Sequence, residues 1–74
     1  MFYATISAEI LRIARATYKY TFFINCVQTL LVRMNKQGAN ISGIKSAIRK
    51  MIGRHSGTFL KFEQPVDKII SDCQ

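Results

Sequence analysis

The chain has 74 residues, 49% of them hydrophobic, and a formal net charge of +7 at pH 7. This length predicts one small domain covering residues 1–74. One histidine, His55, and four carboxylates are too few and too scattered to predict a nucleophile with its base and orienting group, so we do not expect an enzyme. Cys26 and Cys73 lack the paired spacing of a metal site, and we expect neither a metal nor another cofactor.

The positive charge is concentrated in the middle of the sequence. Residues 10–62 hold ten lysines and arginines and no acidic residue, while the acids lie at Glu9 and in the tail after residue 62. A surface adapted only for solubility would mix both signs, whereas a single-sign field raises the local concentration of polyanions. The charge pattern therefore predicts a polyanionic partner, with nucleic acid as the first candidate.

The sequence also predicts a cellular compartment. The N-terminus lacks a charged segment followed by a hydrophobic block, so a secretory signal is not expected. The longest uncharged stretch, residues 20–32, is 13 residues long, and a bilayer-spanning helix needs about 20. The two cysteines give no sign of an oxidising compartment. We expect a cytoplasmic protein without integral membrane insertion.

Hydrophobic residues in the first half follow one repeating spacing. Intervals of four and three alternate through Ile6, Ile10, Ile13, Tyr20, Ile24, Val27, Leu31 and Met34. Thr17 fills the one gap, so the pattern is a heptad, and taken alone it predicts one long helix of roughly thirty residues.

Residues 17–24 carry a competing strand pattern. They are rich in β-branched and aromatic residues, and they alternate with the period of a half-buried strand. Asn25, with Gln28 three residues later, is typical of a helix N-terminus. We favour the strand, because the residue preferences and the cap at Asn25 agree, and we keep the long helix as the alternative.

Residues 37–53 predict a helix end followed by a basic amphipathic helix. Gly38 suits the left-handed position after a helix, and Asn40 or Ser42 can cap the next helix, which we expect to end near Gly53. Its hydrophobic stripe consists of Ile41, Ile44, Ile48, Met51 and Ile52. The opposite face carries Ser42, Lys45, Ser46, Arg49 and Lys50.

The C-terminal part is predicted to form two short elements. Gly53 and Gly57 mark a turn, and residues 58–62 are expected to be a short strand or extended segment. Pro65 suits the first position of a terminal helix. The hydrophobic residues of that helix are Val66, Ile69, Ile70 and Cys73.

Basic residues and polar capping residues are the candidate nucleic-acid contacts. Lysines and arginines on one helix face neutralise phosphates without reading sequence. The candidates are Asn40, Ser42, Lys45, Arg49, Lys50 and Arg54 around the basic helix, and Arg12, Arg15 and Lys19 before it. Exposed aromatic rings offer stacking surfaces to unpaired bases. We favour core packing over stacking for Tyr18, Tyr20, Phe22, Phe59 and Phe62.

Residues 17–53 resemble the ribbon-helix-helix family of DNA-binding proteins. The order of strand, capped helix, break and second helix matches, and Gly38-Ala39-Asn40-Ile41-Ser42-Gly43-Ile44-Lys45 is similar to a Gly-x-Asn-Ile/Leu-Asn-Gln-Ile turn in some plasmid-mobilisation members. The resemblance implies that two chains intertwine and pair their strands, and that this ribbon enters the major groove. It further implies that Thr17, Lys19 and Thr21 read bases, and that backbone phosphates are held by Asn40, Ser42 and Gly43.

The expected fold is mainly α with one or two short strands, built as a ribbon-helix-helix-like core with terminal extensions. The alternative is all-α, with a long heptad-patterned helix and a short basic helix. The expected function is nucleic-acid binding, to DNA or RNA, by a small dimeric regulator. Two other functions stay open: an accessory protein of the phage or mobile-element kind that inhibits an acidic protein or a protein–RNA complex, and binding to anionic membrane surfaces.

Overall fold

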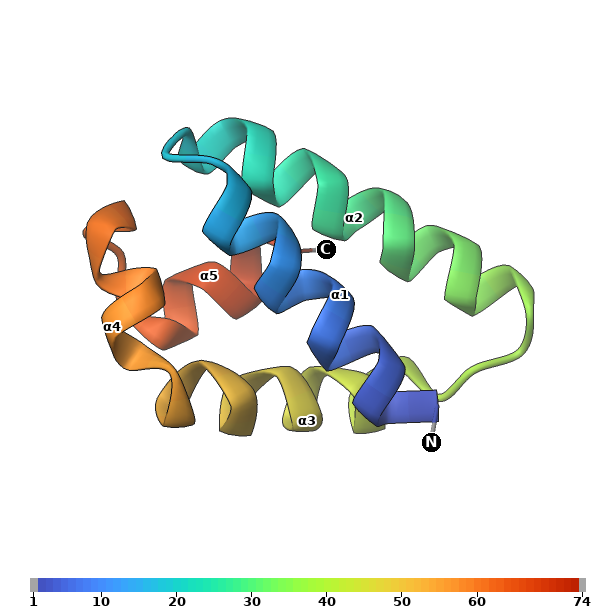
Figure 1. Cartoon of the computed structure of the whole chain (residues 1–74). Helices are drawn as coiled ribbons and strands as arrows, with labels where there is room; N and C mark the ends of the chain where they lie inside the picture. Colours follow the sequence, from blue (N-terminus) through green and yellow to red (C-terminus); the bar gives the residue numbers. More distant parts are fainter. Residues whose placement is uncertain (1, 74) are drawn as a thin grey trace.

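The computed structural model describes residues 2–73, and within that range it contains helices and no strand. The elements are α1 (Phe2–Ala16), α2 (Tyr20–Lys36), α3 (Ile41–Arg54), α4 (Ser56–Phe59), the 3-10 turn η1 (Leu60–Phe62) and α5 (Val66–Asp72). In Figure 1, α1 and α2 form a hairpin, α3 runs beneath them, and α5 lies behind α1. The all-α alternative therefore describes the fold class, and the expected mixed fold with a ribbon-helix-helix-like core is wrong.

Residues 17–24 are not a strand. Residues 17–19 form a turn, in which the Lys19 backbone N–H donates to Thr17 Oγ1 at 3.0 Å, and α2 begins at Tyr20. Phe23 and Ile24 are both buried, with exposed fractions of 1% and 7%. Neighbouring residues of a strand point to opposite faces, whereas a helix can bury both. Packing in the core therefore overrides the strand preference of this segment.

Without this strand, the ribbon-helix-helix resemblance has no structural basis. Residues 2–73 contain no ribbon that enters a major groove or pairs with a second chain. Asn25 lies in the second turn of α2 instead of capping a helix. The expectations that Thr17, Lys19 and Thr21 read bases from a ribbon, and that two chains join through paired strands, are both wrong.

The long-helix alternative correctly predicts that most of the heptad positions in α1 and α2 are buried, but it is wrong that they lie on one continuous helix. The turn at residues 17–19 divides the predicted helix into α1 and α2, which fold back on each other (Figure 1). The heptad positions that are buried in these two helices are Ile6, Ile10, Ile13, Ile24, Val27, Leu31 and Met34. The pattern continues through the turn because both helices turn their hydrophobic faces toward the same core.

Residues 58–62 are not a strand either, and they belong to the end of α4 and to η1. Phe59 and Phe62 are both buried, and residues three apart share a face of a helical turn but not of a strand. The ring of Phe23 stacks on Phe62 with centroids 4.9 Å apart, and it meets Phe59 edge-on at 5.9 Å. Contacts between distant segments thus decide the structure of both aromatic-rich stretches.

The local signals around α3 and α5 are confirmed. Gly38 has a φ of 84°, in the left-handed region that favours glycine. Asn40 caps α3, because its side-chain oxygen accepts from the Gly43 backbone N–H at 3.3 Å. The predicted C-terminal helix exists as α5, but Pro65 is its N-cap residue and lies one position before the predicted first position of the helix. Buried residues of α3 are Ile44, Ile48, Met51 and Ile52.

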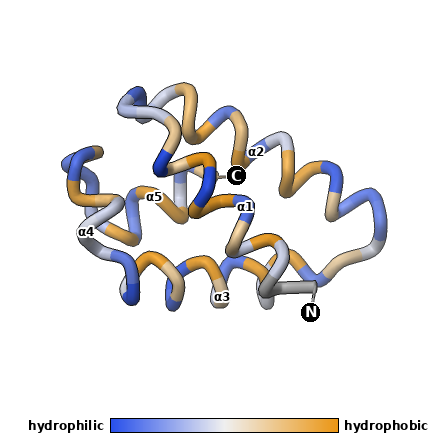
Figure 2. Tube along the Cα trace, in the orientation of Figure 1, coloured by the Kyte–Doolittle hydropathy of each residue, from blue (hydrophilic) through white to orange (hydrophobic). Residues whose placement is uncertain are grey.

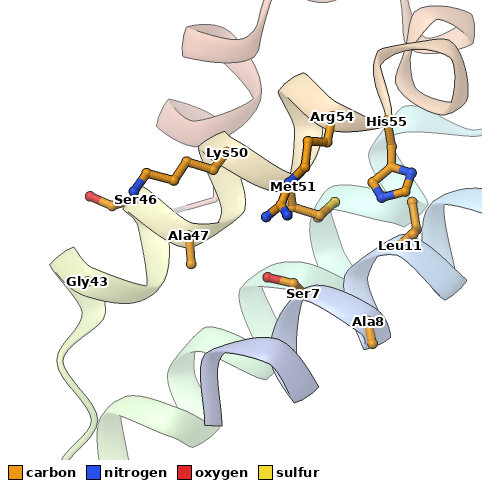
Figure 3. A pocket seen from close by; sticks show the side chains of 10 residues that line it. All are labelled: Ser7, Ala8, Leu11, Gly43, Ser46, Ala47, Lys50, Met51, Arg54 and His55. Atoms are coloured by element: carbon orange, nitrogen blue, oxygen red, sulfur yellow. The ribbon is translucent and has the colours of Figure 1, made fainter. Parts of the chain in front are cut away.

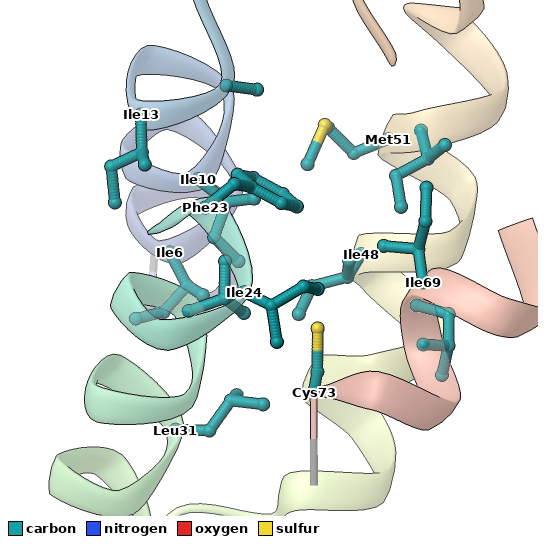
Figure 4. Close-up of a cluster of buried hydrophobic side chains, with 14 of the residues drawn as sticks. Ile6, Ile10, Ile13, Phe23, Ile24, Leu31, Ile48, Met51, Ile69 and Cys73 are labelled. Carbon is teal, nitrogen blue, oxygen red and sulfur yellow. The ribbon is translucent and has the colours of Figure 1, made fainter. Parts of the chain in front are cut away.

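One hydrophobic core receives side chains from all five α-helices and from η1. Figure 2 shows hydrophobic and hydrophilic residues alternating along the helices, as expected for amphipathic helices around a core. Ile10, Val27 and Ile44 are fully buried, and Figure 4 shows side chains of the core cluster meeting between α1, α2, α3 and α5. The core therefore buries most of the hydrophobic face of α3, with Ile41 only partly buried, and the polar residues of α3 lie outside the core.

Two glycine substitutions are expected to change stability in opposite directions. Gly38→Ala should destabilise the protein by about 1 kcal/mol, because an L side chain is strained at positive φ. Gly53→Ala lies inside α3 and should stabilise it by about 0.5 kcal/mol through helix propensity. A Cβ atom at either position meets nothing within 4 Å, so steric clashes do not confound the comparison. Urea unfolding measures both, and a neutral Gly38→Ala would contradict the assigned turn.

Candidate nucleic-acid interface

The cations of α3 lie on two sides of the helix. Lys50 and Arg54, four residues apart, face a groove between α1 and α3. Lys45 is half-buried on the opposite flank, beside Cys73, and Arg49 forms an ion pair with Asp67 of α5. The structure therefore separates the predicted group of three cations and brings Lys50 together with Arg54 instead.

The groove between α1 and α3 has a volume of about 630 Å³. Three of its lining residues, Ala8, Gly43 and Ala47, have a small side chain or none. Its remaining lining residues are Ser7, Leu11, Ser46, Lys50, Met51, Arg54 and His55. Figure 3 shows Ser7 and Ala8 on α1 across the groove from α3, and it shows the Lys50 side chain extending toward Ser46.

The groove is electrostatically positive. The described residues that line it include no acid, and no ion pair of residues 2–73 involves Lys50 or Arg54. Arg15 does not line the groove. It is exposed on α1, four residues beyond Leu11 and seven beyond Ala8, so helical periodicity places it on the same side of α1 as these two lining residues. Lys50, Arg54 and Arg15 together form what we call the groove cations.

Acidic side chains are engaged elsewhere. Arg12 Nε donates to Glu9 at 3.2 Å, and this hydrogen bond lowers the pKa of the Glu9 carboxyl. Asp72 accepts from the Tyr20 hydroxyl at 2.8 Å and from Lys68 Nζ at 3.0 Å, which lowers the pKa of Asp72. Asp67 is paired with Arg49, so three of the four acids have basic partners outside the groove lining.

The remaining candidate residues have separate positions. The side-chain oxygen of Asn40 caps α3, and Ser42 is exposed in the first turn of that helix. Lys19 is exposed at the turn between α1 and α2, and Arg12 is paired with Glu9. None of these four residues lines the groove.

Sequence reasoning missed the groove itself. Gly43, Ala47, Lys50 and Arg54 recur at intervals of four, three and four residues, which is a helical stripe of small and basic residues. This stripe could have indicated from the sequence which side of the helix lines the groove. The contributions of Ser7 and Ala8 had no comparable signal, because they depend on how α1 packs against α3.

The flank of α3 that carries Lys45 offers no reactive group at neutral pH. Lys45 lines a smaller groove of about 340 Å³ together with Gln28, Ile41 and Cys73. Burial raises the pKa of the Cys73 thiol to about 11, so the reactive thiolate is scarce at neutral pH. The geometry of this flank supports packing and gives no arrangement for covalent chemistry.

Comparison with known proteins finds no match among family models, curated proteins or solved structures. The function must therefore be inferred from the residues of the chain. None of the helices in the described range combines the length and the hydrophobicity that a bilayer-spanning segment needs. The same residues contain no group of three His, Cys, Asp or Glu side chains placed to hold a metal ion.

Proposed function

We propose that the protein binds nucleic acid through the groove between α1 and α3, with the groove cations in contact with backbone phosphates. The observation that carries the proposal is that Lys50 and Arg54 line a groove whose described lining residues include no acid. Phosphate contacts of this kind supply affinity without reading sequence. The Ser7 and Ser46 hydroxyls can donate to phosphate oxygens at the same surface.

The packing of α3 favours phosphates over a lipid surface. A basic amphipathic helix binds membranes by burying its hydrophobic face among the lipids. The hydrophobic face of α3 is already occupied, because Ile44, Ile48 and Met51 are buried in the protein core. The helix therefore offers its cations to a partner but lacks a free hydrophobic face for insertion.

A salt titration of binding tests this proposal. With three phosphate contacts on duplex DNA, the plot of log affinity against log salt should have a slope of about −2.7. Affinity should then fall roughly 40-fold between 50 and 200 mM salt. Fluorescence anisotropy of a labelled 16-base-pair duplex measures the slope, and a flat response, or no binding at 50 mM salt, would reject the proposal.

A further inference from the structure

Aromatic and aliphatic side chains are exposed at the end of the molecule where α1 meets α2. Tyr18 in the turn is 82% exposed, Phe22 in the first turn of α2 is 56% exposed, and Leu60 at the start of η1 is 76% exposed. Lys61 joins the two segments, since its Nζ lies 4.4 Å from the centroid of the Tyr18 ring. We call Tyr18, Phe22, Leu60 and Lys61 the aromatic end.

The Tyr18 ring lies outside the hydrophobic core. Tyr20, Phe23, Phe59 and Phe62 pack against one another with centroid distances between 4.9 and 6.5 Å. Tyr18 makes no ring contact with this cluster among the described residues, and its close neighbour is the Lys61 ammonium group. With 82% of the residue exposed, the ring has a large surface available for a flat partner.

Basic residues flank Tyr18 in the sequence, and the Lys61 ammonium group lies over its ring. Arg15 precedes Tyr18 by three residues, and Lys19 follows it directly; both are exposed. Glu63 is the acidic residue nearest to Lys61 in sequence, and in residues 2–73 no ion pair joins the two. A partner of the aromatic end must therefore combine negative charge with aromatic or flat groups, as a single-stranded nucleic acid does.

We propose that the aromatic end binds unpaired bases, with one base stacked on Tyr18 and neighbouring phosphates held by Arg15, Lys19 and Lys61. This inference rests on the proposed function and specifies its substrate as single-stranded nucleic acid. Arg15 links the two surfaces, because it is also one of the groove cations. A strand crossing Arg15 places its phosphates along the groove and its free bases at the aromatic end.

Charge and geometry disfavour two other partners for the aromatic end, a second copy of the chain and a lipid surface. A second copy docked symmetrically would bring Lys19 and Lys61 against the same cations of its partner, and like charges at close range repel. Insertion into lipid would bury the Lys61 ammonium group that rests on the Tyr18 ring, at a high desolvation cost. A stacked base instead leaves this ammonium group in water beside a phosphate.

Matched binding measurements on single and double strands test the inference. The probes are a labelled 12-nucleotide single strand and the duplex of the same sequence, both at 100 mM salt. Tyr18→Ala should weaken single-strand binding roughly tenfold, because stacking on an aromatic side chain contributes on this scale. Duplex binding should change less than twofold, and Tyr18→Phe, which keeps the ring, should retain single-strand affinity.

Val32→Ala is the matched control, because Val32 is an exposed hydrophobic residue of α2 outside the aromatic end. It should leave both affinities unchanged. Tyrosine fluorescence gives a direct readout, since the chain has three tyrosines and no tryptophan. A bound single strand should quench part of this emission, and Tyr18→Phe should remove that part without lowering affinity.

The outcomes separate this inference from the proposed function. If Tyr18→Ala leaves single-strand affinity unchanged while Lys50→Gln/Arg54→Gln still weakens binding, the aromatic end is not a base-binding surface and the groove proposal stands. If neither probe binds, both proposals fail. If Tyr18→Ala and Leu60→Ala leave oligonucleotide binding unchanged but abolish binding to phosphatidylserine vesicles, a lipid surface is the partner and the inference is overturned.

Discussion

Replacing Lys50 and Arg54 together by glutamine is expected to weaken duplex binding on the order of 100-fold at 50 mM salt. Each phosphate contact adds about 0.9 to the magnitude of the slope of log affinity against log salt. Two contacts therefore raise the affinity roughly 200-fold when salt is lowered from 1 M to 50 mM, and the double variant should lose a factor of this order. The slope itself should flatten from about −2.7 to about −0.9. Neither side chain forms an ion pair among residues 2–73, so the fold should remain intact.

The double variant Lys45→Gln/Arg49→Gln is the matched control for this experiment. It removes the same number of charges from the same helix, but from the flank that faces α5. We expect it to weaken binding only a few-fold, through the loss of general positive charge. Equal losses in both double variants would contradict a localised site at the groove, because net charge alone would then explain the affinity.

The sequence predicted those elements whose signals are local. Gly38 ends α2 and Asn40 caps α3, because a positive φ and a capping hydrogen bond involve only neighbouring residues. The hydrophobic stripe of α3 was also predicted correctly. It follows from helical periodicity alone, once the two ends of the helix are known.

The two predicted strands were wrong for one shared reason. Residues 17–24 and 58–62 are aromatic and β-branched, and such residues prefer strands only where a sheet gives them a surface to pack on. Here the rings of Phe23, Phe59 and Phe62 pack on one another across the fold. The two contacts of Phe23 join residues 36 and 39 positions apart in the chain, and no local sequence pattern predicts them.

The basic helix was predicted, but the side that carries the candidate site was not. Lys45 and Lys50 are five residues apart, which corresponds to about 140° around a helix. Both positions lie outside the hydrophobic stripe, so a helical projection treats them as one polar face. Only the packing of α1 on one flank and α5 on the other separates them, and it places Lys50 in the groove.

Phe23→Ala is expected to have the largest effect on stability, a loss of about 3–5 kcal/mol. Phe23 is 1% exposed and contacts three other rings, so truncation leaves a cavity among residues fixed by the rest of the fold. A domain of this size has a total stability of roughly 4–11 kcal/mol. The variant should therefore lose a large part of this stability and unfold at a much lower urea concentration than the unmodified protein, as measured by far-ultraviolet circular dichroism.

Substitutions at Phe22 and Ile24, on either side of Phe23, test whether this segment is a helix or a strand. Phe22 is 56% exposed, so Phe22→Ala should cost less than about 1 kcal/mol. Ile24 is 7% exposed, and Ile24→Ala should cost about 2–5 kcal/mol. Large losses at both Phe23 and Ile24, with a small loss at Phe22, require a helix, because a strand would place residues 22 and 24 on the same face. Similar effects at residues 22 and 24 would contradict the helical start of α2.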